Sequence, residues 1–120
     1  MIIALKINDL KLRVYLTPYF SPKTFSKVVN QLPLNLHAHV YGDTLIAGTG
    51  IETAVESHRI LLYERELAYW PPAAALVIAL RGSTSFGSPV NPLGYIINAA
   101  EELRYLKDGE SLRIILDFDS

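Results

Sequence analysis

The sequence contains no cysteine, and this absence excludes several kinds of chemistry at once. Disulfide bonds, thiol catalysis and zinc–thiolate centres all need cysteine side chains. The fold therefore does not depend on an oxidising compartment, and a hydrophobic core has to hold it together. Half of the 120 residues are hydrophobic, which is enough for one domain that spans residues 1–120.

The sequence also lacks an excess of charge of either sign. Eleven basic side chains stand against twelve acidic ones, which gives a formal net charge of -1. A chain with this balance has no overall electrostatic attraction to a phosphate backbone or to an anionic membrane surface. We therefore expect neither a nucleic acid nor a membrane as a partner.

Long hydrophobic runs are missing as well. The N-terminal stretch MIIALKINDLKLRV is interrupted by Lys6, Asn8 and Asp9, so it is too short for a signal peptide or a spanning helix. We expect a cytoplasmic location. The chain has no glycine-rich phosphate loop and no G-x-S-x-G motif, and it gives no reason to expect a cofactor.

The first third of the chain shows a hairpin of two strands, a helix and a further strand. The runs IIALKI and LKLRVYL are joined by Asn8-Asp9, a pair typical of a tight hairpin turn. The segment SPKTFSKVVNQL predicts a helix capped by Ser21, with Pro22 in its first turn. Its apolar stripe consists of Phe25, Val28, Val29 and Leu32. After Pro33, alternating polarity predicts a strand.

The rest of the chain predicts further strands and one more helix. ETAVESHRILLYEREL is expected to form strand, and ALVIAL predicts a central strand buried on both faces. Residues 81–92 are rich in Gly, Ser and Pro and predict a loop. GYIIN and LRIILDF predict strands on either side of a helix through AAEELRYLK, with Asn98 and Glu101 as a capping box. Mainly β structure follows, as a closed barrel with two short helices capping the barrel ends.

Three segments resemble a known family. They read YWPPAAALVIAL from Tyr69, SPVNPLGYI from Ser88 and LKDGESLRIIL from Leu106. With the hairpin and the first helix in their expected places, this pattern is similar to that of the small prokaryotic cyclophilin-like proteins over nearly the whole chain. The resemblance implies a closed eight-stranded barrel of the cyclophilin type. It implies less about activity, because a shared fold does not carry a shared function.

The cyclophilins themselves carry an arginine on the strand after the first helix, in a pattern similar to FHRII that leads to a QGGD turn. Here that strand reads NLHAHVYGD. The segment SHRILLYE, which contains His58 and Arg59, looks similar to the signature but comes one strand later. Prolyl isomerisation needs a cationic donor near the prolyl nitrogen and an apolar slot for the ring. The signature's absence from its expected position weakens the case for isomerase activity.

The predicted strand after the first helix offers the first candidate ligand contacts. His37, His39 and Tyr41 alternate along one face of this strand. The opposite face is apolar and consists of Leu34, Leu36, Ala38 and Val40. The trio lies either along a binding groove on the outer barrel wall or on an ordinary solvated strand face.

A rigid aromatic corner supplies two more candidates, Tyr69 and Trp70. Pro71 and Pro72 fix two backbone φ angles and hold Trp70 extended. The corner serves either as the entry to a buried strand or as a preorganised platform for a ligand.

Phe86 and Asn91 are the last two candidates, and both lie in the loop predicted for residues 81–92. Loops of this length often carry function. A phenylalanine among glycines and serines suggests that it covers something, and Asn91 is suited to bond a ligand or its own turn. The alternative is a lid that closes the barrel.

The sequence therefore favours a protein that binds an extended peptide or a small apolar ligand in a groove on the barrel surface. A weak or divergent peptidyl-prolyl cis-trans isomerase is one alternative. Another is a small metal-dependent enzyme that uses His37 and His39, with Asp43, Glu52 or His58 as a third ligand, although their spacing does not force a metal site. Use of the same surface for contact with a second copy of the chain also stays open.

Overall fold

The computed structural model describes residues 1–98 and 101–119. These residues form β1 (Ile2–Ile7), β2 (Leu10–Leu16), α1 (Pro22–Asn30), β3 (Leu34–Tyr41), β4 (Thr44–Gly48), β5 (Leu61–Tyr63), β6 (Glu66–Trp70), η1 (Pro71–Ala73), β7 (Ala75–Ala79), β8 (Ser83–Ser85), β9 (Asn91–Ile96), η2 (Glu101–Tyr105) and β10 (Ser111–Phe118), where η marks a 3-10 helix. No helix within the described ranges is long and apolar enough to cross a membrane.

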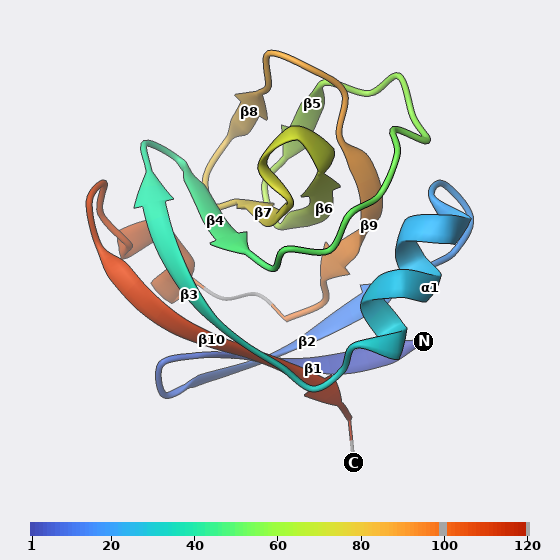
Figure 1. Ribbon diagram of the computed structural model, residues 1–120. Coiled ribbons are helices and arrows are strands. Elements are labelled where there is room, and N and C mark those ends of the chain that lie inside the picture. Colours follow the sequence, from blue (N-terminus) through green and yellow to red (C-terminus); the bar gives the residue numbers. More distant parts are fainter. Residues whose placement is uncertain (99–100, 120) are drawn as a thin grey trace.

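Eight of the strands close into an antiparallel barrel. Around the barrel their order is β1-β10-β3-β4-β7-β6-β9-β2, and β2 pairs with β1 to complete the ring (Figure 1). β5 and β8 form a separate two-stranded sheet outside it. The predicted fold, mainly β with a closed eight-stranded barrel, is confirmed.

Alternation of apolar and polar residues explains how the strands close this barrel. Ile3, Leu5 and Ile7 of β1 point inward and are buried, while the residues between them face outward. The β1–β2 hairpin turns at Asn8, whose φ of 50° lies in the left-handed region that asparagine tolerates. β3 shows the predicted alternation, with Ala38 and Val40 fully buried.

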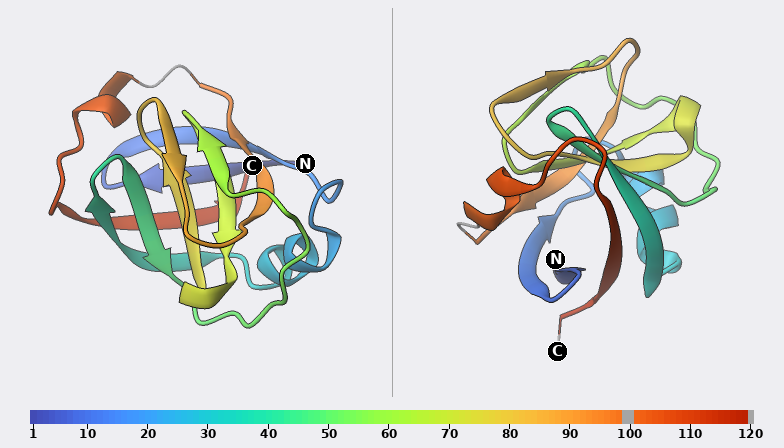
Figure 2. Two further views of the ribbon diagram at one scale, coloured as in Figure 1. Left: turned by 90° about the horizontal axis from the view of Figure 1, so that it is seen from above. Right: turned by 90° about the vertical axis from the view of Figure 1, so that its left-hand side faces the viewer.

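Two short helices lie at opposite ends of the barrel. α1 packs its predicted apolar stripe against the barrel core, and Val28 of that stripe is fully buried. η2 lies at the other end (Figure 2). Its Leu103 is part of the same core. The barrel interior is therefore filled by side chains from its strands and from both ends.

The second helix differs from the prediction. Glu101–Tyr105 is a 3-10 helix rather than an α-helix. The first two residues of the predicted helix, 99–100, lie outside the described residues. Asn98, the predicted cap, instead accepts a hydrogen bond from the backbone N–H of Arg13 at 2.5 Å. Its side chain thus ties the end of β9 to β2.

Two further predictions about local structure were right only in part. Of the strand predicted for residues 52–67, only β5 and the first two residues of β6 are strand. Residues 49–60 contain no strand and run along the outside of the barrel from β4 to β5 (Figure 1). The predicted loop 81–92 also includes β8 and the first two residues of β9. In both segments the polarity pattern was too mixed to locate strands of three residues. Such short strands form because they contact the barrel wall, and the local sequence does not show these contacts.

A second apolar cluster lies between the barrel and the β5–β8 sheet. Leu62, Phe86 and Val90 pack there against the outer face of β6 and β7. Every residue of β7 is buried as a result, which confirms the prediction of a central strand covered on both faces. The cluster fixes the position of the β5–β8 sheet on the barrel wall.

Candidate functional site

The predicted trio on β3 lies on the outer wall of the barrel and is exposed. His37, His39 and Tyr41 share this face, and the exposed fraction of Tyr41 is 60%. The ring of His39 lies 6.2 Å from that of Tyr41, and its Nδ1 is 3.0 Å from Ser111 Oγ on β10. We refer to His37, His39 and Tyr41 together with Ser83–Ser85 of β8 as the β3–β8 face.

β8 has an unpaired edge. The backbone N–H of Phe86 donates to the carbonyl of Ile60 at 2.8 Å, and Leu62 lies opposite Thr84. Because hydrogen-bonded pairs alternate along an antiparallel ladder, the N–H and C=O groups of Ser83 and Ser85 point away from β5. In the part of the chain that the structure describes, no other strand pairs with β8.

The outer edge of β5, by contrast, is closed by side chains. Arg59 Nε donates to the carbonyl of Leu61 at 2.7 Å, and Glu66 Oε1 accepts from the N–H of Tyr63 at 2.8 Å. Arg59 and Glu66 also form an ion pair with each other. The two edges of the small sheet therefore differ. Side chains bond the backbone groups at the edge of β5, whereas among the described residues none does so at the edge of β8.

β8 lies on the β4 side of the small sheet. β5 lies over β6 and β7, whereas Thr84 of β8 is tied to β4, where Thr44 Oγ1 donates to Thr84 Oγ1 at 3.0 Å. The other neighbour of β4 is β3, which carries His39 and Tyr41. β8 and β3 thus lie on the same side of the molecule (Figure 1).

The aromatic corner divides its two rings between the two apolar clusters. Tyr69 is fully buried inside the barrel, and Trp70 is half-buried beneath the β5–β8 sheet. The Trp70 ring lies 5.2 Å from that of Phe86, and its Nε1 donates to Ser88 Oγ at 2.9 Å. The prolines form η1, a tight connection between β6 and β7. Trp70 and Phe86 therefore contact each other rather than the trio on β3.

The hydroxyl of Tyr69 anchors the start of the 49–60 segment. It donates to the carbonyl of Ile51 at 2.5 Å and lies 2.7 Å from Thr49 Oγ1. Burial raises the pKa of this phenol, although the hydrogen bonds with Thr49 and Ile51 act in the opposite direction. The phenol thus stays neutral and serves as a hydrogen-bond donor.

Asn91 anchors the middle of the same segment. It is fully buried; its Nδ2 donates to Thr24 Oγ1 and to the carbonyl of Ala54, both at 2.9 Å. Its Oδ1 accepts from the N–H of Glu56 at 2.8 Å. All three contacts are within the chain, so this amide joins β9, α1 and residues 49–60.

The N-terminus of helix α1 is capped by Glu56. The prediction that Ser21 caps it was wrong. The carboxylate of Glu56 accepts from the N–H of Lys23 at 3.0 Å, from the N–H of Thr24 at 2.8 Å and from the Thr24 hydroxyl at 2.6 Å. Ser21 occupies the N-cap position, but its side chain makes no cap hydrogen bond. A carboxylate reached from a distant segment satisfies the first turn better, because it accepts two amides and suits the helix dipole.

These contacts predict a pH-dependent contribution of Glu56 to stability. Burial by itself would raise the pKa of Glu56, but the hydrogen bonds from Thr24 and Lys23 outweigh it and lower the pKa below its ordinary value of 4.5. A lowered folded-state pKa stabilises the fold above pH 4.5, and this contribution is lost as the pH falls through the folded-state value. We expect Glu56→Gln to cost about 1–2 kcal/mol at neutral pH.

Urea denaturation of Glu56→Gln and the unmodified protein at a series of pH values tests this. The difference in unfolding free energy should be constant near neutral pH and shrink in acid. Glu52→Gln is a suitable control, since the exposed Glu52 contributes only its backbone carbonyl, to Lys27. A difference that stayed constant down to strongly acid pH would rule out the carboxylate cap.

The structure also places the residues considered for metal binding and for isomerisation. Across residues 1–98 and 101–119, no group of three His, Asp or Glu side chains is close enough together to hold a metal ion. His37 and His39 share one strand face, but none of Asp43, Glu52 and His58 joins them as a third ligand. The guanidinium of Arg59 is held by Leu61 and Glu66 at the edge of β5.

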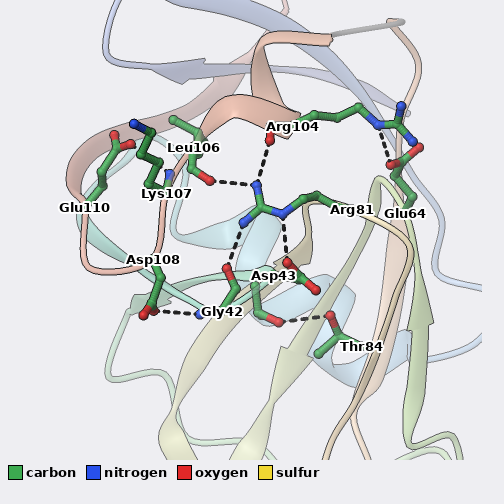
Figure 3. Close-up of polar contacts among 11 residues, drawn as sticks. Gly42, Asp43, Glu64, Arg81, Thr84, Arg104, Leu106, Lys107, Asp108 and Glu110 are labelled. Carbon is green, nitrogen blue, oxygen red and sulfur yellow. Dashed lines mark hydrogen bonds and ion pairs between the residues drawn. The ribbon is translucent and has the colours of Figure 1, made fainter.

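Sequence reasoning did not identify Arg81, although its side chain makes four hydrogen bonds, more than any other side chain among the described residues. Its guanidinium donates to the carbonyls of Gly42, Arg104 and Leu106 and to the carboxylate of Asp43 (Figure 3). It thereby joins the β3–β4 turn to η2. Only its position directly after a buried strand hinted at such a role.

Solved structures with the same architecture are known. A hypothetical protein of Archaeoglobus fulgidus, determined in solution, superposes with a TM-score of 0.76 at 25% identity and covers 99% of this chain and 95% of its own. McbB, solved in complex with tryptophan, gives a TM-score of 0.75 at 11% identity over 98% of this chain and 45% of its own. The second likeness shows the fold alone.

The sequence itself points to the same group of proteins. No curated protein matches it. The family described as cyclophilin-like, however, matches residues 1–115, which is nearly the whole of the closed barrel and includes both segments that form the outer β5–β8 sheet. The match agrees with the resemblance seen in the YWPP and SPVNPLGYI segments. The chain therefore belongs to the cyclophilin-like family.

Proposed function

We propose that the protein binds an extended peptide segment, which adds as a strand to β8 and lays its side chains over His39 and Tyr41. The open edge of β8 is the observation that carries this proposal. An unpaired edge offers N–H and C=O groups that pair with any extended chain, and nearby side chains then select among sequences. His39 and Tyr41 are exposed on β3, which lies next to β4 on the same side of the barrel, and are suited to this selection.

The contrast between the two edges supports binding at β8. Strand edges in native proteins are commonly protected by charged side chains. The Arg59–Glu66 pair protects β5 in this way, whereas β8 carries only two serines and a threonine. A peptide would therefore add on the β3 side of the small sheet and not on the other.

The packing beneath the sheet favours a peptide over a small apolar ligand. Trp70 and Phe86 fill the space between the β5–β8 sheet and the barrel, and Phe86 is only 8% exposed. Their contact keeps β8 fixed and leaves its backbone, rather than an apolar slot, for recognition. The role we propose for these two rings is support of the edge from below.

The contacts of Arg59 favour binding without isomerisation. A prolyl isomerase needs a cationic donor directed at the prolyl nitrogen. Arg59 is engaged on the far edge of the small sheet by Leu61 and Glu66. The proposal therefore assigns no bond rearrangement to the β3–β8 face.

Selection from a phage-displayed library of random linear peptides, followed by fluorescence anisotropy on the enriched sequences, tests the proposal. We expect the double variant His39→Ala/Tyr41→Ala to bind these peptides about tenfold more weakly or worse. Ser85→Pro should have a similar effect, because proline removes one N–H from the edge and is tolerated in edge strands.

Tyr19→Ala serves as the matched control. Tyr19 is 82% exposed and lies between β2 and α1, at the opposite end of the barrel from η2. Its loss should leave peptide affinity unchanged. Failure to enrich any peptide, or equal affinity of all three variants for the enriched ones, would overturn the proposal.

A further inference from the structure

A second candidate site lies on another part of the outer wall, away from β8. A cavity of about 600 Å³ is lined by residues 4–6 of β1, residues 11–13 of β2, Asn98, Ile115 and residues 117–119. β1 pairs with β2 on one side and with β10 on the other, so the floor of the cavity is the backbone of three adjacent strands. None of the residues of the β3–β8 face lines it.

Two lysines lie side by side on adjacent strands in the lining of this cavity. Lys6 and Lys11 are directly opposite in the β1–β2 register, and both are exposed. Side chains in such a position have Cβ atoms about 4.5–5.5 Å apart, and like charges there destabilise a sheet. The residue opposite Lys6 on β10 is Ile115, which cannot compensate the charge. Of the ion pairs formed within the described residues, none involves either lysine.

One carboxylate of the cavity is held at its other end. Asp119 pairs with Arg13, with 3.3 Å between Oδ2 and Nη2. Asp117 lies opposite Ala4, which in turn lies opposite Arg13. The lysine pair therefore forms a positive end. Asp119 is paired with the arginine, and Asp117 lies between the two ends on β10, diagonal to Lys6.

Apolar surface connects the two ends. Ala4 and Ile115 are half-buried in the cavity wall, and Phe118 is 51% exposed at its rim. A bare inorganic ion would use only the lysines. A ligand with an apolar body would in addition cover Ala4 and Ile115.

We propose that this cavity binds a small organic carboxylate, whose charged group lies between Lys6 and Lys11 and whose apolar body covers Ala4 and Ile115. The ligand anion offsets the repulsion between the two ammonium groups, and the exposed apolar surface is removed from water. The site is separate from the proposed peptide site and does not depend on it.

An NMR titration with benzoate as the probe tests the proposal, with inorganic phosphate titrated in parallel at matched ionic strength. Benzoate should shift the amide signals of residues 4–6, 11–13 and 115–118 at millimolar concentration. The variant Lys6→Gln/Lys11→Gln should bind benzoate about tenfold more weakly. Lys23→Gln/Lys107→Gln removes two charges elsewhere and should bind as the unmodified protein does.

The melting temperatures of the two double variants separate a binding role from a structural one. Removal of opposed like charges should leave the stability of Lys6→Gln/Lys11→Gln unchanged or raise it. A marked fall would show that the lysines serve the fold and would overturn the proposal. Equal benzoate affinity in both variants, no shift at all, or phosphate shifts as large as those of benzoate would also overturn it.

Discussion

Replacing Gly94 with alanine should destabilise the barrel by about 4 kcal/mol or more, the largest effect that we expect from any single change. A Cβ at this position in β9 would lie 1.7 Å from the carbonyl oxygen of Tyr15 on β2. That oxygen belongs to the backbone of a paired strand, so it cannot move away without separating β2 from β9. The barrel would have to open at this seam.

Urea denaturation followed by tryptophan fluorescence measures the effect, and Gly48→Ala is the matched control. Gly48 also lies in a barrel strand, but a Cβ there would have no atom within 4 Å. We expect a change of no more than about 1 kcal/mol, because alanine restricts the unfolded chain without creating a clash. Equal effects at the two positions would show that β2 and β9 do not approach as closely as described.

Replacing Arg81 with glutamine should cost about 2–4 kcal/mol. Its guanidinium makes four hydrogen bonds at 2.6–2.8 Å, to three backbone carbonyls and to Asp43 (Figure 3). Two of the carbonyls belong to Arg104 and Leu106, at the end of η2. Glutamine has no fork of N–H donors that reaches all four acceptors, so η2 should detach from the barrel end before the strands separate.

Hydrogen exchange measured by NMR distinguishes local detachment from general loss of stability. In Arg81→Gln, the amides of residues 101–110 should exchange faster than they do in the unmodified protein. The exchange rates of the amides of β1 and β2 should change much less. Arg104→Gln is the control: its side chain is 61% exposed and makes only a surface ion pair with Glu64, so its loss should cost less than about 1 kcal/mol. Comparable destabilisation by the two changes would contradict the role given to Arg81.

Patterning along the strands was sufficient to predict the barrel. The alternation in β1, β3 and β10 and the unbroken apolar run of β7 each reflect how many faces of a strand are buried, and this is a local property of the sequence. The two-residue turn at Asn8 was equally local. Such features need no knowledge of what a strand pairs with.

Long-range contacts were beyond sequence reasoning. The cap of α1 comes from Glu56, 32 residues after Thr24, and nothing in the local pattern singles out this glutamate among its neighbours. The β5–β8 sheet depends on contacts of Leu62, Phe86 and Val90 with the barrel wall. Whether a strand edge is open or closed depends on such contacts as well, so the candidate site could be located on β3 but not completed with β8.

The segments on which the family resemblance was based make contacts that stabilise the fold. In SPVNPLGYI, Asn91 joins three parts of the chain through its amide, and Gly94 permits the close approach of β2. In YWPP, the two rings fill two separate apolar clusters. A family pattern of this kind identifies an architecture. Function has to be sought on surfaces to which these segments do not contribute.

Because β10 pairs with both β1 and β3, the barrel cannot close until residues 111–118 have been synthesised. β1, β2 and β3 are complete long before residues 111–118 have left the ribosome, yet β1 and β3 both need β10 as their neighbour. Until then the nascent chain carries two open edges that are rich in isoleucine, leucine and valine. Non-local pairing of this type is slow and exposes a chain to aggregation. The protein should therefore depend more on chaperones while it is being translated than after its release.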